Sequence, residues 1–197
     1  MLKSQALQLL NEKISKCNKC FELSNYRIEK RNLYVFGEGN SSARLMIIGE
    51  APGANEAEKG VPFCGKSGKL LDNIIKAAKW RREDLFVTNT IKCRPIGNRE
   101  PFDCELENCR KFLDMQIKVI DPEWILCLGR VASNNLLKNN LPIGEIRGKI
   151  YEYCGKKVIC TYHPSYVLQA DESKQAEAKK SIWEDLQPII FSLQTSF

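Results

Sequence analysis

Residues 48–68, IGEAPGANEAEKGVPFCGKSG, contain a predicted strand end, loop and helix start from which the architecture can be inferred. The apolar run Leu45–Ile48 leads into them and predicts a buried strand that ends in a tight loop rich in backbone N–H groups. Glu50 stands at the start of the loop, Phe63 brings an aromatic ring back towards it, and a helix is expected near Lys66. Open α/β sheets bind ligands at strand carboxyl ends and helix N-termini. Glu50 and Phe63 therefore predict a site for a flat ligand rich in acceptors; the alternative is a solvated loop beside a core phenylalanine.

The composition is that of a soluble globular protein, with 197 residues of which 43% are hydrophobic and 27% charged. This length suits a sizeable core, and we expect a single domain over residues 1–197. No apolar run approaches the ~20 residues that span a bilayer, and the N-terminus lacks the features of a signal peptide, so a cytoplasmic location is expected. A monomer is expected as well. The formal net charge of +6 mildly favours an anionic partner, of which nucleic acid is the commonest.

Nine cysteines are many for an intracellular chain, and their odd number argues for a metal ion or cluster over a disulfide framework. Cys17 and Cys20 form a Cys-x-x-Cys pair after an amphipathic segment, and this spacing lets two thiolates bind one ion or cluster. Cys93 is the third candidate ligand, and either Cys104 or Cys109 is the fourth. Four thiolates suit zinc or a 4Fe–4S cluster, and spacing alone leaves both open. A redox pair or unconnected thiols are the alternatives.

Three further apolar runs predict core strands that end in polar residues. Leu85–Ile91 places Asn89 near its carboxyl end, and an Asn carboxamide pairs with a face that presents N–H beside C=O, as an imide does. Glu123–Gly129 leads into another helix start, and Lys157–Tyr162 is followed by His163, the only histidine of the chain. A turn-forming Asn and a structural His are the alternatives. The sequence also predicts helices over 2–14, 66–78, 103–119 and 172–193, a hairpin over 149–162 and a loop over 27–33.

Six motifs occur in order along the chain: Gly49–Gly53, Gly60–Phe63, Thr88–Asn89, Lys92–Pro95, Asn98–Pro101 and His163–Ser165. As a set they resemble the family 4 uracil-DNA glycosylases, the iron–sulfur branch of that superfamily, over nearly the whole chain. The resemblance implies a three-layer α/β/α sandwich around a small, mainly parallel four-stranded sheet, and uracil-containing DNA as the substrate. It implies a 4Fe–4S cluster held by Cys17, Cys20, Cys93 and Cys109. The other cysteines would then be small, mostly buried hydrophobic residues: Cys64, Cys104, Cys127, Cys154 and Cys160.

The same resemblance implies a role for each residue around the base. Glu50 would position the attacking water, and His163 would donate a hydrogen bond to uracil O2 as negative charge builds on the leaving base. Asn89 would pair with uracil N3–H and O4, which rejects cytosine because its donor and acceptor are reversed. Phe63 would stack on the ring. Glu56 would lie against uracil C5 and exclude the methyl group of thymine.

The remaining residues implied by the resemblance contact either the base through the loop backbone or the DNA on either side of it. Gly49 and Gly53 offer backbone donors; Ser165, Arg130 and Ser133 hold flanking phosphates; and Val167 and Leu168 wedge into the vacated base stack.

Two other classes of protein compete with this interpretation. The first is a non-catalytic DNA-binding or polymerase-associated module of the same fold with zinc in the cysteine site. The second is a redox protein whose cluster carries electrons. As a protein partner, a sliding clamp is a natural hypothesis for a repair enzyme.

Overall fold

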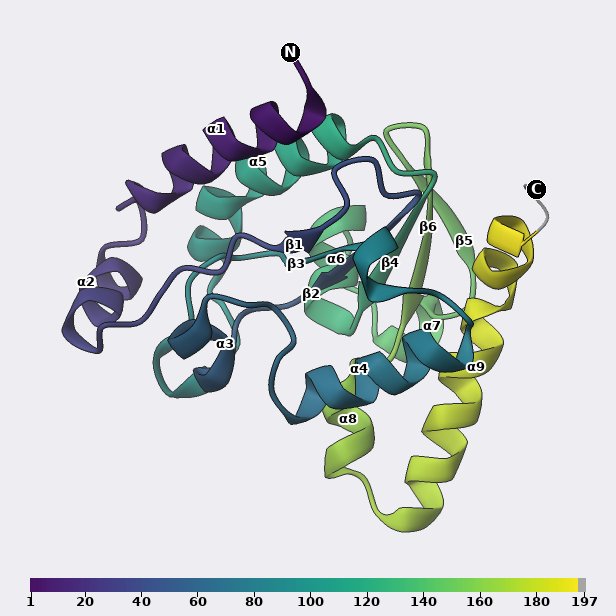
Figure 1. The fold of residues 1–197 in the computed structure, drawn as a ribbon. Helices are drawn as coiled ribbons and strands as arrows, with labels where there is room; N and C mark the ends of the chain where they lie inside the picture. Colours follow the sequence, from purple (N-terminus) through teal and green to yellow (C-terminus); the bar gives the residue numbers. More distant parts are fainter. Residues whose placement is uncertain (195–197) are drawn as a thin grey trace.

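The computed structural model describes residues 1–194, which form a mixed six-stranded sheet in the order β1-β3-β2-β4-β6-β5 (Figure 1). The parallel core consists of β3 (Phe86–Asn89), β2 (Leu45–Gly49), β4 (Trp124–Leu128) and β6 (Lys156–Thr161). The antiparallel edges are β1 (Glu38–Gly39) and β5 (Ile150–Tyr153). The mainly parallel sheet is confirmed, but it has six strands where four were predicted. β1 is too short to produce a periodic pattern, and the predicted hairpin with β6 adds β5 to the sheet.

Helices cover both faces of the sheet. One face carries α4 (Lys66–Ala77), α8 (Pro164–Gln169) and α9 (Glu172–Gln194). The other carries α1 (Lys3–Ser15), α5 (Asp103–Ile120), α6 (Arg130–Leu137) and α7 (Ile143–Ile146). The short helix α2 (Phe21–Glu29) lies between α1 and β1 in the chain, and α3 (Ala54–Lys59) lies between β2 and α4. Because α2 extends to Glu29, the predicted loop over 27–33 is wrong for its first three residues. Among the described residues, no helix is long and apolar enough to cross a membrane.

The alternation of side chains along β2 produces the three layers. Leu45 and Ile47 pack with α4, α8 and α9, whereas Met46 and Ile48 pack with α1, α5, α6 and α7. Successive side chains of a strand point to opposite faces, so a strand covered on both sides must be apolar throughout. The continuous apolar run Leu45–Ile48 therefore becomes a central strand, and the predicted three-layer α/β/α sandwich is confirmed.

The parallel strands end at one edge of the sheet. Gly49, the last residue of β2, lies opposite Asn89, the last residue of β3. On the other side, the N–H of Gly129 after β4 donates to the carbonyl of Thr161 at the end of β6. This register places the residues that follow all four strands beside one another, as open α/β sheets require for a ligand site.

Candidate active site and cysteine site

The predicted catalytic and base-binding residues line one pocket at this edge of the sheet. Glu50 follows β2, Asn89 ends β3 and His163 follows β6, and all three line the pocket together with Phe63 and Ser165. Gly53 and Glu56 line it as well. The neighbouring groove, between α5 and α6, is lined by Arg130. The strand ends therefore bring the predicted residues together, although they are far apart in the sequence.

Gly49 lies where the backbone of β2 approaches both Asn89 and Phe63. A Cβ atom at this position would lie 2.5 Å from Phe63 Cζ and closer still to Asn89 Oδ1. Real Cβ atoms do not approach heavy atoms this closely, so any side chain would displace the ring, the carboxamide or both. The glycine is needed here for its lack of a side chain, because its φ angle is not positive.

Substituting Gly49 by alanine is expected to reduce the turnover of substrate about tenfold, because a shift of about 1 Å in positioned groups slows enzymes to this degree or more. The loss should affect both KM and kcat, because the displaced groups line the pocket. Steady-state kinetics measure the effect, with Gly144→Ala as the matched control, since a Cβ there meets nothing within 4 Å. Unchanged kinetics of Gly49→Ala would contradict the placement of Asn89 and Phe63 against this glycine.

Glu56 holds the loop that carries Phe63. Its carboxylate accepts hydrogen bonds from the backbone N–H groups of Gly53 (3.1 Å), Cys64 (2.9 Å) and Gly65 (2.7 Å). Phe63 itself has a φ angle of +51°, a left-handed conformation that costs a bulky residue energy unless the surroundings impose it. The bonds from Cys64 and Gly65 impose it from the C-terminal side. Glu56 thus fixes the aromatic ring, in addition to facing the pocket.

Glu50 is a carboxylate in a largely buried position. Its pKa is raised to about 7, mainly by burial and also by the negative charge of Glu100, while the guanidinium of Arg130 opposes the rise. Near neutral pH the group therefore exchanges between acid and carboxylate, which is the range in which a general base works best. Glu100 was not found from the sequence, because an exposed glutamate in a loop gives no local signal.

His163 is held as a neutral imidazole with one defined tautomer. Its Nδ1 accepts the backbone N–H of Ser165 at 3.1 Å and lies 2.7 Å from the Ser165 hydroxyl. Because Nδ1 is an acceptor, the proton of the neutral ring must be on Nε2, the nitrogen left free to contact a ligand. Burial lowers the pKa of His163 to about 4, against the opposing effect of Glu56. The ring also lies 5.8 Å from that of Phe63, centroid to centroid.

Two of the predicted DNA contacts are wrong. Ser133 is fully buried and its hydroxyl donates to the carbonyl of Gly129 at 2.7 Å, inside its own helix, so it has no donor for a phosphate. Val167 is also fully buried, in the core beneath α8, and cannot wedge into DNA from there. Leu168 is 46% exposed, and so is the unpredicted neighbour Tyr166, at 47%.

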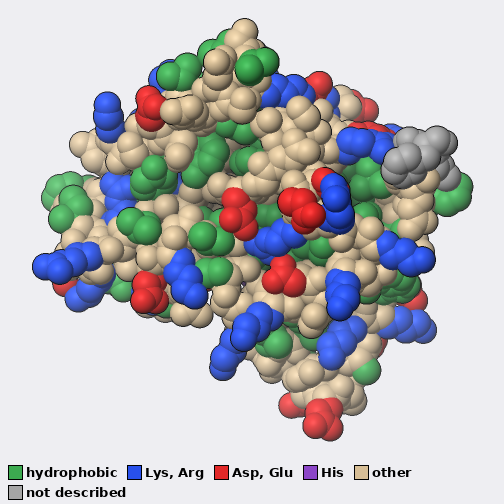
Figure 2. All heavy atoms as spheres, in the orientation of Figure 1, with side chains coloured by type: hydrophobic (Ala, Val, Ile, Leu, Met, Phe, Trp, Pro, Cys, Tyr) green, Lys and Arg blue, Asp and Glu red, His purple; other side chains and the backbone are tan. Residues whose placement is uncertain are grey.

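The predicted phosphate contact Arg130 is exposed but already paired. Its Nη2 lies 2.7 and 2.6 Å from the two carboxylate oxygens of Glu100. A phosphate that binds Arg130 must therefore compete with this carboxylate. Elsewhere, Figure 2 shows lysine and arginine side chains interspersed with acidic ones over the visible face, so the net positive charge is not gathered into one patch there.

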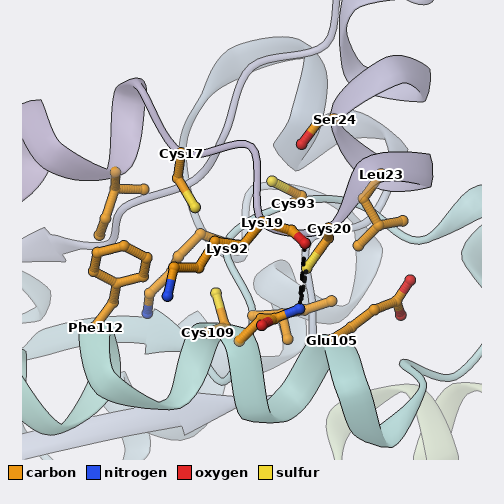
Figure 3. Close-up of a pocket in the computed structure, with 13 residues that line it drawn as sticks. Cys17, Lys19, Cys20, Leu23, Ser24, Lys92, Cys93, Glu105, Cys109 and Phe112 are labelled. Atoms are coloured by element: carbon orange, nitrogen blue, oxygen red, sulfur yellow. Dashed lines mark hydrogen bonds between the residues drawn. The ribbon is translucent and has the colours of Figure 1, made fainter.

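The four predicted cluster ligands surround one cavity. Cys17 follows α1, Cys20 precedes α2, Cys93 follows β3 and Cys109 lies on α5 (Figure 3). α1 runs along α5, which brings the N-terminal pair to the central pair (Figure 1). Within residues 1–194, no three Cys, His, Asp or Glu side chains converge closely enough for a single metal ion.

Burial dominates the electrostatics of this cavity. It raises the pKa of Cys93 to about 12 and that of Cys109 to about 11, with Arg27 and Lys92 respectively opposing the rise. Cys93 and Cys109 can therefore be thiolates only when a cationic centre is bound to them, and cysteine binds metals in this deprotonated form. Of the cysteines expected to be buried hydrophobic residues, Cys127 and Cys160 are buried, whereas Cys104 and Cys154 are exposed, so the prediction is wrong for those two.

Together, the fold and the site define a three-layer α/β protein whose pocket at the strand ends is lined by an aromatic side chain and buried hydrogen-bonding groups. A model of the uracil DNA glycosylase superfamily matches residues 36–187. The chain belongs to that superfamily. A type-4 uracil-DNA glycosylase of Thermotoga maritima is 34% identical over 94% of this chain and 93% of its own length. Those of Archaeoglobus fulgidus and Saccharolobus solfataricus are 40% and 43% identical, over 89% and 82% of this chain and 92% and 77% of their own lengths.

Proposed function

We propose that this chain is a DNA repair enzyme that flips uracil out of DNA and hydrolyses its N-glycosidic bond, leaving an abasic site for base excision repair. The observation that carries the proposal is the convergence of Asn89, Phe63 and His163 on one pocket at the carboxyl edge of the sheet. A non-catalytic DNA-binding module would need neither a carboxylate poised near neutral pH nor a histidine with a fixed tautomer.

Base recognition is assigned to Asn89 and Phe63. Asn89 is only 2% exposed, so a base edge that reaches it replaces water completely. Its carboxamide donates to uracil O4 and accepts from N3–H; cytosine presents the reverse pattern and would leave two buried groups unpaired, at a cost of several kcal/mol. The ring of Phe63 stacks on the base. Glu56, beside this ring, excludes the C5 methyl group of thymine, and the backbone N–H groups of the Gly49–Gly53 loop are further donors.

The reaction breaks the bond between C1′ of the sugar and N1 of uracil. The bonding electron pair leaves with the base and spreads onto O2, where the Nε2–H of His163 stabilises it. The sugar becomes an oxocarbenium ion, and a water held by Glu50 adds to C1′ while its proton passes to the Glu50 carboxylate. The carboxylate charge also stabilises the cationic sugar. The products are uracil, which is protonated from solvent, and the abasic site.

Access to the base requires it to leave the DNA stack, which costs a few kcal/mol. Leu168 and Tyr166 are the exposed large hydrophobic side chains of α8, near the pocket residue Ser165, and we assign to them the filling of the vacated space. Ser165 and Arg130 are assigned to the flanking phosphates, with Arg130 exchanging Glu100 for a phosphate.

Base release from a labelled oligonucleotide with one uracil tests the proposed function. Alkali-labile sites at uracil, and none in matched thymine and cytosine oligonucleotides, are the expected result. If folded protein with its metal centre intact leaves every strand uncut, the binding module becomes the better interpretation. If activity appears but fails when the centre is reduced, the redox alternative gains support.

We also propose that Cys17, Cys20, Cys93 and Cys109 bind a 4Fe–4S cluster. The four cysteines come from three separate segments of the chain and line one cavity, and four cysteine thiolates are the ligands of a 4Fe–4S cluster. When bound, the cluster would join the segment between α1 and α2, the loop after β3, and α5, and thus stabilise the fold. A single domain over residues 1–197, a monomeric state, a cytoplasmic location and a sliding-clamp contact stay predictions from the sequence; a pull-down that never recovers a clamp would remove the last of these.

Substituting Cys109 by serine is expected to abolish or strongly reduce iron binding and to lower the thermal unfolding midpoint, because one cluster ligand is lost. Cys104→Ser is the matched control, since Cys104 lies on the same helix but is exposed. Analysis of iron, sulfide and zinc per chain measures the result. Four irons and four sulfides in the wild type, with zinc absent, are expected; one zinc per chain would contradict the cluster.

A further inference from the structure

Lys92 is a charged side chain buried in the interior. It is only 1% exposed and is one of the largest fully buried side chains of the described residues. Lysine is almost never fully buried unless it is paired, because an ammonium removed from water loses several kcal/mol of hydration free energy. Such a residue needs an explanation in the contacts that it makes.

The ammonium of Lys92 binds the end of β3. Its Nζ donates to the Asn89 carbonyl oxygen at 2.6 Å and to Thr88 Oγ1 at 2.7 Å. The Thr88 hydroxyl in turn donates to the carbonyl oxygen of Phe36 at 2.9 Å. These bonds fix the backbone from which the carboxamide of Asn89 projects into the pocket.

Both partners of the ammonium are neutral, so they do not balance its charge. Within the described part of the chain, Lys92 makes no ion pair with a carboxylate; burial lowers its pKa to about 8, and a charged Cys109 opposes this fall. The backbone N–H of Lys92 also donates to the Cys109 sulfur. Lys92 lines the same cavity as the four cysteines, and Figure 3 shows it among them. Cysteine thiolates that bind a metal centre in this cavity would therefore supply the negative charge that faces this cation.

We propose that Lys92 is a positioning residue that couples the cysteine-held cluster to uracil recognition. The negative charge of the four thiolates holds the ammonium in the interior, and the ammonium holds the carbonyl of Asn89. The inference rests on the proposed function, and it assigns to the cluster an influence on base selection in addition to its contribution to the fold. A cluster held only for stability would need no buried cation that reaches the base-reading strand.

Lys92→Met tests the coupling, because methionine fills a similar volume without the charge or the donors. Lys118→Met is the matched control, since Lys118 is an exposed lysine on α5 that does not line the cysteine cavity. We expect Lys92→Met to reduce the ratio of kcat/KM for uracil over cytosine at least tenfold. We also expect the cluster's reduction potential to become more negative, because a nearby positive charge is lost. Lys118→Met should change neither quantity.

Thr88→Val is the second variant, because it keeps the charge of Lys92 and removes one of its acceptors. It should reduce selectivity for uracil while the reduction potential changes little. If Lys92→Met does not fold, Thr88→Val still tests whether the bonds of Lys92 to the end of β3 affect the selection of uracil. Wild-type selectivity in a folded, iron-loaded Lys92→Met or Thr88→Val protein would overturn the coupling. An inactive wild type would instead overturn the proposed function, and the reduction potentials would still report whether Lys92 faces the cluster.

Discussion

Replacing Glu50 by glutamine is expected to slow uracil release by about 10²–10⁴-fold at pH 8, the range by which a positioned general base accelerates reactions. The amide fits the same space but cannot accept the proton of the attacking water or stabilise the cationic sugar by charge. Single-turnover cleavage of the uracil oligonucleotide measures the change. Glu58→Gln on α3 is the matched control, because Glu58 is exposed and does not line the pocket.

The same substitution is expected to stabilise the protein. The pKa of Glu50 is about 7 in the folded state and 4.5 for a freely solvated glutamate, so the folded state disfavours the carboxylate. The stability that this shift provides is complete below pH 4.5 and is lost as the pH rises through 7. Glu50→Gln should therefore unfold at a higher temperature than the wild type at pH 8 and at about the same temperature at pH 4. A slower and more stable variant separates lost chemistry from lost structure.

The pH dependence of the wild type follows from the same carboxylate. Activity should rise through a midpoint near pH 7 as Glu50 deprotonates, and then level off. Glu100→Gln should move this midpoint to lower pH, because a negative charge that raises the pKa of Glu50 is removed. A pH profile that is flat between pH 5 and 9, or a Glu50→Gln variant with wild-type rate, would contradict the role of Glu50 as the base.

The sequence predicted those parts of the site that depend on local patterns. Apolar runs located the core strands, and the polar residues at or just after the carboxyl ends of these runs placed Glu50, Asn89 and His163 at a common edge. Parallel strands force this convergence, so no knowledge of distances was needed. The four cysteines were likewise chosen from their spacing and from the family resemblance, and they surround one cavity.

The parts that the sequence did not predict depend on packing between distant elements. Val167 and Leu168 are neighbours of similar polarity, and only the packing of α8 against α4 and α9 decides that one is buried and the other exposed. Lys92 was missed because a lysine after a strand is usually at the surface; its burial follows from the closure of α5 over the cysteine cavity. The ion pair of Arg130 with Glu100 was not predicted for the same reason, because it joins segments that are far apart in the sequence.

Substituting His163 by alanine is expected to slow uracil release by about 10²–10³-fold, the usual cost of removing one donor that stabilises a developing oxyanion. The loss should fall on kcat more than on KM, because negative charge on uracil O2 develops only as the glycosidic bond breaks. His163→Gln keeps an N–H donor on a flexible side chain and should recover part of the rate. Single-turnover rates with all three proteins measure this order.

The pH dependence distinguishes a neutral donor from a general acid at this position. With a pKa of about 4, His163 is neutral from pH 5 to pH 9, and its Nε2–H is present throughout this range because Ser165 fixes the tautomer. Substituting His163 by alanine should therefore lower the rate by the same factor at every pH between 5 and 9. The midpoint of the pH profile, which Glu50 sets, should stay unchanged. A wild-type rate that falls above pH 6, with the fall absent in His163→Ala, would instead identify an imidazolium that protonates the departing base, and the role of neutral donor would be wrong.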